Sequence, residues 1–135
     1  MKYLLDTNIC IYISNRRPER VRARFLRCRP GDIAMSVVTY MELIYGACKS
    51  NQRERSLIVV RELTNLVPVL DLGPAAAQHF ARIRSGLERA GTPIGAFDLL
   101  IAAHALSLGL TLVSNNVREF KRIKDLKIEN WAEAE

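Results

Sequence analysis

The stretch GAFDLLIAAHALSLGLTLVSNN, residues 95–116, decides how this chain folds. Residues 96–108 are mostly apolar and long enough for a buried helix, and Gly109 is a typical helix stop. The apolar run from Thr111 is typical of a short buried strand. Residues 99–117 carry no charge, but their His, Ser, Thr and Asn side chains argue against a membrane span. The stretch therefore predicts a buried helix that leads directly into a strand.

The same alternation extends over the rest of the chain. Strands are predicted at residues 2–5, 32–36, 67–70, 111–114 and 127–131. Helices are predicted at residues 9–15, 18–28, around Glu42, 51–66, 75–91 and 96–108. Strands separated by helices form parallel sheets with helices on both faces. We therefore expect one α/β domain, residues 1–135, with a central, mainly parallel sheet.

Composition and charge fit that frame. The chain has 135 residues, 49% of them hydrophobic and 25% charged, which is typical of one globular domain. The formal charge of +6 favours a polyanionic partner such as nucleic acid, with an acidic protein partner or solubility as alternatives. Cys10, Cys28 and Cys48 are odd in number and widely spaced, so we expect small buried hydrophobes in a reducing cytoplasm and no zinc site. The first residues do not form a secretory signal.

Three acidic residues stand in apolar surroundings. Asp6 ends the first predicted strand, Glu42 lies inside VVTYMELIY (residues 37–45), and Asp98 opens the helix of the first stretch. A buried ionised carboxylate must be paired, hydrogen-bonded or bound to a metal. No Lys or Arg lies within four residues of Glu42 or Asp98, which favours a shared divalent cation. The alternative is that each acid caps a helix, as we predict for Asp71 before the helix near Gly73.

The predicted sheet brings these acids together. Ligands bind at the carboxyl ends of parallel strands, and five side chains are predicted to converge there: Asp6, Glu42, Asp98, Asn116 and Glu119. They offer oxygen and no thiolate, so Mg²⁺ or Mn²⁺ fits better than zinc or copper. Neither His79 nor His104 has an evident metal-binding partner, and for both we expect a core or surface role.

Four segments carry a family resemblance: LLDTN (4–8), SVVTYMELIYGA (36–47), GTPIGAFDLLIAAHA (91–105) and LVSNNVREF (112–120). In this order, over essentially the whole chain, they resemble the PIN-domain ribonucleases, and specifically the VapC toxins of bacterial toxin–antitoxin pairs. The resemblance implies a three-layer α/β/α domain. It also implies that Asp6, Glu42 and Asp98 form the acidic site, with Asp6 and Asp98 as direct Mg²⁺ ligands.

The fourth acidic position of many PIN domains falls on Asn116, which is a departure from the pattern. Three readings stay open: Asn116 ligates as a neutral oxygen, it acts through water, or Glu119 substitutes for it. Thr7, Asn8 and Ser36 are expected near the same edge, where they can hydrogen-bond metal-bound waters or a phosphate. Thr7 and Asn8 are equally suited to turn and helix-cap positions.

The resemblance also implies an activity and partners. The activity is Mg²⁺-dependent hydrolysis of RNA phosphodiesters by one or two ions, which leaves 5′-phosphate and 3′-hydroxyl ends and inhibits translation. The first expectation for the substrate is tRNA, specifically initiator tRNA. The implied partners are a second copy of the chain and an antitoxin whose carboxyl-terminal segment lies in a groove and blocks the metal site.

Two basic stretches are candidates for contact with the RNA backbone. Arg118, Lys121 and Arg122, with Lys124, lie beside the predicted site and are expected to hold the phosphates. The stretch from Arg16 to Arg29 faces either RNA or an acidic antitoxin, or is a solvated helix face.

Other classes of protein fit less well. A haloacid-dehalogenase-like phosphatase requires Asp two residues after the first acid, where this chain has Asn8. A receiver-type signalling domain requires paired acids after the first strand and a late Lys, and neither is evident. The remaining alternative is a non-catalytic RNA-binding or protein-interaction module on the same fold, which a metal titration with a nuclease assay separates from an enzyme.

Overall fold

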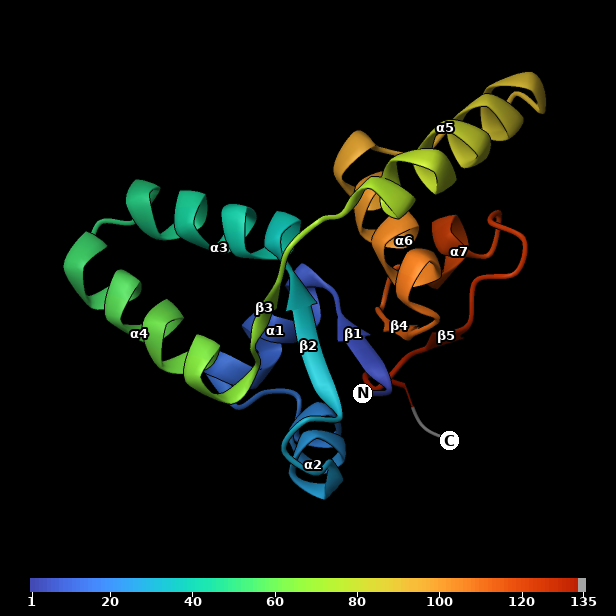
Figure 1. The fold of residues 1–135 in the computed structure, drawn as a ribbon. Coiled ribbons are helices and arrows are strands. Elements are labelled where there is room, and N and C mark those ends of the chain that lie inside the picture. The colour runs from blue at the N-terminus through green and yellow to red at the C-terminus, as the bar shows by residue number, and fades with distance from the viewer. Residues whose placement is uncertain (134–135) are drawn as a thin grey trace.

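The computed structural model describes residues 1–133 and contains a five-stranded sheet between two groups of helices (Figure 1). All strand pairs are parallel, and the strand order is β3-β2-β1-β4-β5. The strands are β1 (Tyr3–Leu5), β2 (Ile33–Ser36), β3 (Val69–Leu70), β4 (Thr111–Val113) and β5 (Ile128–Glu129). The helices are α1 (Thr7–Asn15), α2 (Glu19–Arg27), α3 (Val37–Lys49), α4 (Arg53–Leu66), α5 (Pro74–Arg89), α6 (Ala96–Leu108) and α7 (Val117–Phe120).

Alternation along the central strands builds two cores, one on each face of the sheet. Successive strand residues point to opposite faces. The register sets Leu4 beside Ala34 and Leu112, and all three are buried in the apolar cluster that includes residues of α5 and α6. The following residue of each strand is buried in the cluster that includes residues of α1 to α4; these residues are Leu5, Met35 and Val113. Both faces of the sheet are therefore covered.

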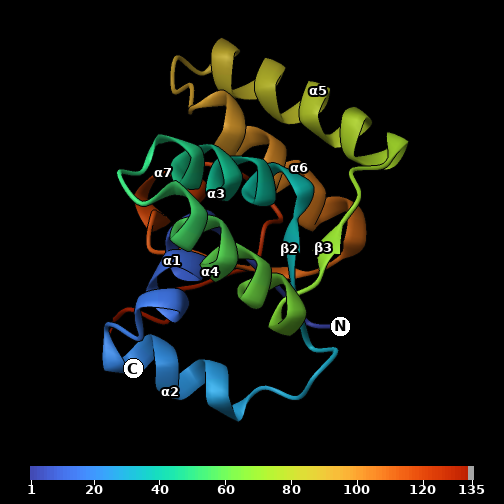
Figure 2. The same cartoon turned by 90° about the vertical axis from the view of Figure 1, so that its left-hand side faces the viewer.

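The chain reverses its direction of winding beside β1. From β1 it winds through β2 to β3 on one side, and β4 and β5 then add to the other side. The boundary between β1 and β4 is thus the switch point at which open parallel sheets bind ligands. Asp6 and Ser114 directly follow these two strands. Both views place α2 below the strands, at the end opposite their carboxyl termini (Figures 1 and 2).

Short polar side chains set where the helices begin. Asp6 is the N-cap of α1, and its Oδ1 accepts the Asn8 backbone N–H at 2.8 Å. Ser36 is the N-cap of α3, and its Oγ accepts the Val38 N–H at 3.1 Å. Helix α6 ends at Gly109, which adopts the left-handed conformation with φ 66° that glycine tolerates best.

The sequence-based predictions are confirmed for the fold class and for the strand and helix order, with some corrections. Helix α1 begins at Thr7 and not at Ile9, the last strand covers only 128–129, and α7 was not predicted. The cysteine prediction holds for Cys10 only, because Cys28 is half-buried and Cys48 is exposed. No helix within residues 1–133 is long and apolar enough to span a membrane.

Candidate active site at the carboxyl edge of the sheet

Asp6 occupies the switch point and is almost fully buried, with 4% of its surface exposed. One carboxylate oxygen caps α1 through Asn8, and the other accepts the Ser114 hydroxyl at 2.5 Å. Burial raises the pKa of Asp6 and the charge of Glu42 raises it further, whereas the two hydrogen bonds oppose the shift. Asp6 is therefore a cap and a member of the acidic site at once.

Glu42 approaches Asp6 from α3. The Thr7 hydroxyl, at the start of α1, donates to Glu42 Oε1 at 2.6 Å and lies 3.4 Å from the Thr39 hydroxyl. Thr39 is fully buried and Thr7 is half-buried. The carboxylate of Glu42 is thus fixed by the residue that follows Asp6 in the chain.

Asp98 lies in the first turn of α6 but does not cap it, because the N-cap is Gly95 and no side-chain cap bond forms there. Its Oδ2 accepts the Asn116 side-chain amide at 3.2 Å. Burial raises the pKa of Asp98 to about 6, and the charges of Asp6, Glu119 and Glu42 add to the shift. All five predicted site residues therefore meet at one edge.

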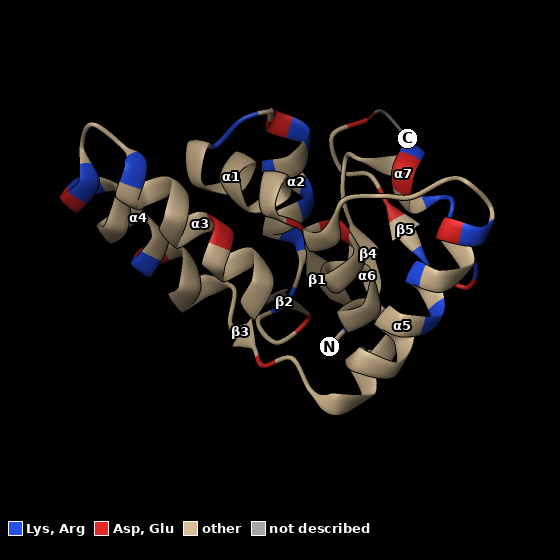
Figure 3. Cartoon of the chain, turned by 90° about the horizontal axis from the view of Figure 1, so that it is seen from above, with Lys and Arg blue, Asp and Glu red and all other residues tan. Residues whose placement is uncertain are grey.

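The site concentrates negative charge. None of the ion pairs between described residues involves Asp6, Glu42 or Asp98. Seen from above, acidic segments lie near the middle of the molecule between α3 and α6, while Lys and Arg colour α2, α4 and α5 (Figure 3). In residues 1–133 no three acidic, His or Cys side chains are close enough to form a ready three-ligand cluster.

That arrangement suits a hard cation held by few protein ligands. Mg²⁺ usually keeps several waters and binds through one or two carboxylates. Asp6 and Asp98 supply two carboxylates that repel each other, and a divalent cation relieves that repulsion. The donor set at the edge therefore fits Mg²⁺ or Mn²⁺ better than a cation that needs nitrogen or sulfur ligands.

Thr7, Asn8 and Ser36, which were predicted to lie around the acids, differ in their surroundings. Thr7 is at the site, as described above. Asn8 is exposed, and its amide lies 3.4 Å from the Asn115 side-chain oxygen. Ser36 is fully buried, and its hydroxyl contacts the Val38 N–H and His104 inside the protein.

Two polar residues at this edge, Ser114 and Asn115, were not predicted from the sequence. Ser114 binds both Asp6 and the Asn116 backbone N–H, the latter at 2.9 Å. Asn115 donates its amide to the Tyr12 hydroxyl at 2.8 Å. The available signal was the position of SNN directly after the fourth strand, which placed Asn116 at the edge and applies equally to its two neighbours.

The basic residues divide into two groups. Arg118 and Lys121 are exposed on and after α7, beside Glu119 and Asn116. Arg122 is exposed too, but it donates to the Pro93 carbonyl at 3.1 Å. The arginines of α2 lie at the opposite end of the sheet from the acids (Figures 1 and 2).

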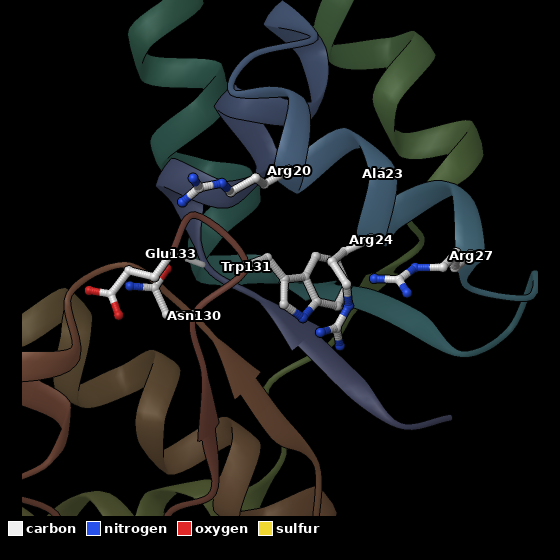
Figure 4. Close-up of a pocket in the computed structure, with 7 residues that line it drawn as sticks. All are labelled: Arg20, Ala23, Arg24, Arg27, Asn130, Trp131 and Glu133. Atoms are coloured by element: carbon white, nitrogen blue, oxygen red, sulfur yellow. The ribbon is translucent and has the colours of Figure 1, made fainter. Parts of the chain in front are cut away.

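A cavity of about 450 Å³ lies away from the acids, between α2 and residues 130–133 (Figure 4). There Arg24 lies 5.3 Å above the ring of Trp131 and forms an ion pair with Glu129 at 2.8 Å. Trp131 is only 2% exposed and also donates to Glu129 at 3.1 Å. These contacts anchor the end of the described chain to α2, and the cavity shares no residue with the acidic edge.

Fold and site together define a class of protein: an α/β/α domain that gathers carboxylates at the switch point of its parallel sheet. Comparison with known proteins agrees. The PIN domain family model matches residues 3–126. The chain belongs to the PIN domain family and, within it, groups with the VapC proteins.

Similar proteins cover the chain from end to end. It is 48% identical over 132 residues to the tRNA(fMet)-specific endonuclease VapC of Shigella flexneri, covering 98% of this chain and 99% of that protein. It is 46% identical to ribonuclease VapC2 of Haemophilus influenzae, covering 97% and 98%. Among solved structures, DNA-bound VapBC from Salmonella typhimurium has a TM-score of 0.91 at 46% identity, covering 97% of this chain and 98% of that one. VapBC-1 from nontypeable Haemophilus influenzae also has a TM-score of 0.91, at 42% identity, covering 98% and 100%.

Proposed function

We propose that this protein is a Mg²⁺-dependent endoribonuclease, the toxin of a toxin–antitoxin pair, which cuts initiator tRNA and is neutralised by a VapB-like antitoxin. The observation that carries the proposal is the meeting of Asp6, Glu42 and Asp98 at the switch point, where the pKa of Asp98 is raised to about 6 by burial and by its acidic neighbours. A hydrolytic site for phosphodiesters needs such a concentration of carboxylates, because phosphate alone holds a hard cation poorly.

Asp6 and Asp98 are the residues that hold the ion in this proposal. When bound, Mg²⁺ supplies an acidified water and neutralises charge on the scissile phosphate. Ser114 keeps Asp6 oriented through its hydroxyl, and Asn116 does the same for Asp98 through its amide. The fourth acidic position of the family is then filled by a neutral donor that positions a ligand, with the charge of Glu119 nearby.

Glu42 is the residue proposed to take the proton from the attacking water. The Thr7 hydroxyl binds Oε1 and leaves Oε2 without a hydrogen bond from any residue among 1–133. Oε2 is thus the atom available for proton transfer, and Thr7 fixes the plane of the carboxylate. Cleavage by water leaves a 5′-phosphate and a 3′-hydroxyl.

The substrate proposal rests on relatives and on charge. A relative with 48% identity is a tRNA(fMet)-specific endonuclease, and the chain carries a net charge of +6. Exposed Arg118 and Lys121 lie on and just after α7, next to Glu119, and in this proposal they bind RNA phosphates beside the acids. RNA held through its backbone is positioned without base contacts, so the choice of tRNA depends on its shape.

The partner proposal rests on the VapBC neighbours and on an apolar groove. A cavity of about 390 Å³ runs between α1, α3 and α4; Ile11, Leu43, Val59, Val60 and Leu63 line it, and Glu42 lies at its rim. An amphipathic antitoxin segment with a basic side chain fits this groove, because it buries apolar surface and carries a positive charge toward the acids. A homodimer of the toxin is part of the same proposal.

The test is cleavage of purified RNAs by the free protein. Initiator tRNA, elongator methionine tRNA and an unstructured RNA are incubated with the protein in Mg²⁺ or in EDTA, and the product ends are mapped. The proposal expects Mg²⁺-dependent cleavage of initiator tRNA first, with 5′-phosphate ends. Binding of RNA without cleavage in Mg²⁺ and in Mn²⁺ favours the non-catalytic module instead.

A further inference from the structure

A polar pair lies buried between the two helices that carry Glu42 and Asp98. His104, in the middle of α6, is 1% exposed, and Ser36, at the junction of β2 and α3, is fully buried. His104 Nδ1 and Ser36 Oγ are 2.7 Å apart. In the sequence, His104 stands among Ile101, Ala102, Ala103 and Ala105, all buried and apolar. A buried polar side chain in this apolar stretch raises the question of its role.

The contact between the two side chains is a hydrogen bond and not an ion pair, because the serine hydroxyl carries no charge. Burial lowers the pKa of His104, while the main chain and carboxylate of Asp71 act in the opposite direction. One proton lies between Nδ1 and Oγ in either tautomer of the neutral ring. Nε2 is buried and makes no hydrogen bond with any residue among 1–133. Replacing both partners by apolar groups of similar shape can be neutral for stability, so stability alone does not explain the pair.

The positions of the two bonded residues relative to Asp98 and Glu42 suggest a role for the hydrogen bond. Asp98 precedes His104 by six residues in α6, and Glu42 follows Ser36 by six residues in α3. Six residues of helix rise about 9 Å along the axis, so Asp98 and Glu42 lie a similar axial rise from the two bonded residues. Ser36 is also the N-cap of α3 through Val38, which fixes where that helix starts. The bond thus connects the start of α3 to the middle of α6.

We propose that His104 and Ser36 are positioning residues, whose hydrogen bond holds α6 against the start of α3 and so sets where Asp98 stands relative to Asp6 and Glu42, and hence the ability of this edge to bind its divalent cation. The inference rests on the proposed function. It assigns to a buried histidine a role that neither the acids nor their direct hydrogen-bond partners Thr7, Ser114 and Asn116 perform. The bond is remote from the chemistry and acts only through the two helices.

The experiment compares four single variants of the full chain and the double variant that combines His104→Leu with Ser36→Ala. His104→Leu and Ser36→Ala each remove the bond, and His104→Asn keeps a polar group near the place of Nδ1. Ser107→Ala is the matched control, because the Ser107 hydroxyl bonds the His104 carbonyl at 2.8 Å within α6 and does not connect the two helices. Thermal melting, calorimetric titration with Mg²⁺ alone, and kcat and KM for RNA cleavage are measured for each variant.

For His104→Leu we expect about tenfold weaker Mg²⁺ binding and about tenfold lower kcat, with little change in KM, because Asp98 loses its fixed position. Ser36→Ala gives at least the same loss, since it also removes the N-cap of α3. The double variant is no worse than Ser36→Ala, because both changes remove the same bond. His104→Asn recovers most of the Mg²⁺ affinity, and Ser107→Ala behaves as wild type.

Two results overturn the inference. If wild type binds Mg²⁺ and cuts RNA, and folded His104→Leu does so equally well, the bond is a packing feature only. If the losses in His104→Leu and Ser36→Ala add in the double variant, the two side chains act separately. A wild-type protein that neither binds Mg²⁺ nor cuts RNA overturns the proposed function, and the inference that rests on it falls with it.

Discussion

Replacing Asp98 by Asn should make the metal-free protein more stable at neutral pH while it abolishes cleavage. The ionised carboxylate is partly buried and faces Asp6, Glu119 and Glu42, so its pKa is raised from 3.8 to about 6. Such a difference corresponds to about 3 kcal/mol of unfavourable free energy in the charged form. Because Asp98 is only partly buried, solvent screening reduces this to about 1–2 kcal/mol.

The Asp98→Asn variant keeps the hydrogen bond that the wild-type carboxylate accepts. Asn116 donates its amide to Asp98 Oδ2, and the side-chain oxygen of Asn at position 98 accepts the same bond. A gain of about 1–2 kcal/mol in a domain of this size raises the melting temperature by about 5 °C. Glu62→Gln, which removes one acidic charge from an exposed position on α4, is the matched control and should leave the melting temperature almost unchanged.

The gain must depend on pH with a definite sign. The folded protein holds the Asp98 proton up to about pH 6, whereas the unfolded chain releases it near pH 4. Wild-type stability therefore falls relative to that of the variant as the pH rises from about 4 to about 6, and the two are equal below pH 4. Thermal melts in EDTA across this range measure the difference. A difference that is constant with pH, or that grows toward acid, refutes the reasoning.

Mg²⁺ should reverse the order of stability of wild type and Asp98→Asn. Mg²⁺ at ten times its dissociation constant stabilises a binding-competent protein by about 1.4 kcal/mol. Wild type should gain this stability, and Asp98→Asn should gain much less because it has lost a charged ligand. Equal stabilisation of both proteins by Mg²⁺ places the ion elsewhere.

Three further predictions concern residues at the same edge of the sheet. Asn116→Asp should keep or raise activity because it adds a charged oxygen, and Asn116→Ala should lower activity. If Glu119→Gln lowers activity more than Asn116→Ala does, the fourth acidic position belongs to Glu119. Thr7→Val, which removes the hydroxyl that binds Glu42 and keeps the shape, should lower kcat about tenfold with a nearly unchanged melting temperature. Ala at Arg118 and Lys121 should weaken binding to all RNAs alike and reduce the slope of log affinity against log salt by about 0.7 per lost contact; selective loss of one RNA indicates base recognition, and no loss indicates a solvated surface.

The acids could be predicted from the sequence because their positions depend on local patterns. Asp6 ends a strand and Asp98 starts an apolar helix, and a parallel sheet brings strand ends and helix starts to one edge. The structure confirms the helix cap for Asp6, and the role of a site carboxylate, which stays a prediction, is compatible with it because its two oxygens take different partners.

The unpredicted parts depend on contacts between distant segments. Ser114 reaches Asp6 because Leu5 aligns with Val113 across β1 and β4, and the hydrogen bond joins residues 108 positions apart. The bond from His104 to Ser36 spans 68 positions and leaves no periodic signal in either helix. Helix α7 has four residues, too few for a helical repeat to be visible.

The carboxylate-bound cation is tested most directly by the cleavage of initiator tRNA by the purified protein as Mg²⁺ is removed and restored. We expect cleavage in Mg²⁺, none in excess EDTA, recovery when Mg²⁺ is added back, and no cleavage by Asp98→Asn under any of these conditions. Wild-type cleavage that persists in EDTA, or an Asp98→Asn variant that cuts at the wild-type rate, contradicts a cation held by the carboxylates at this edge of the sheet.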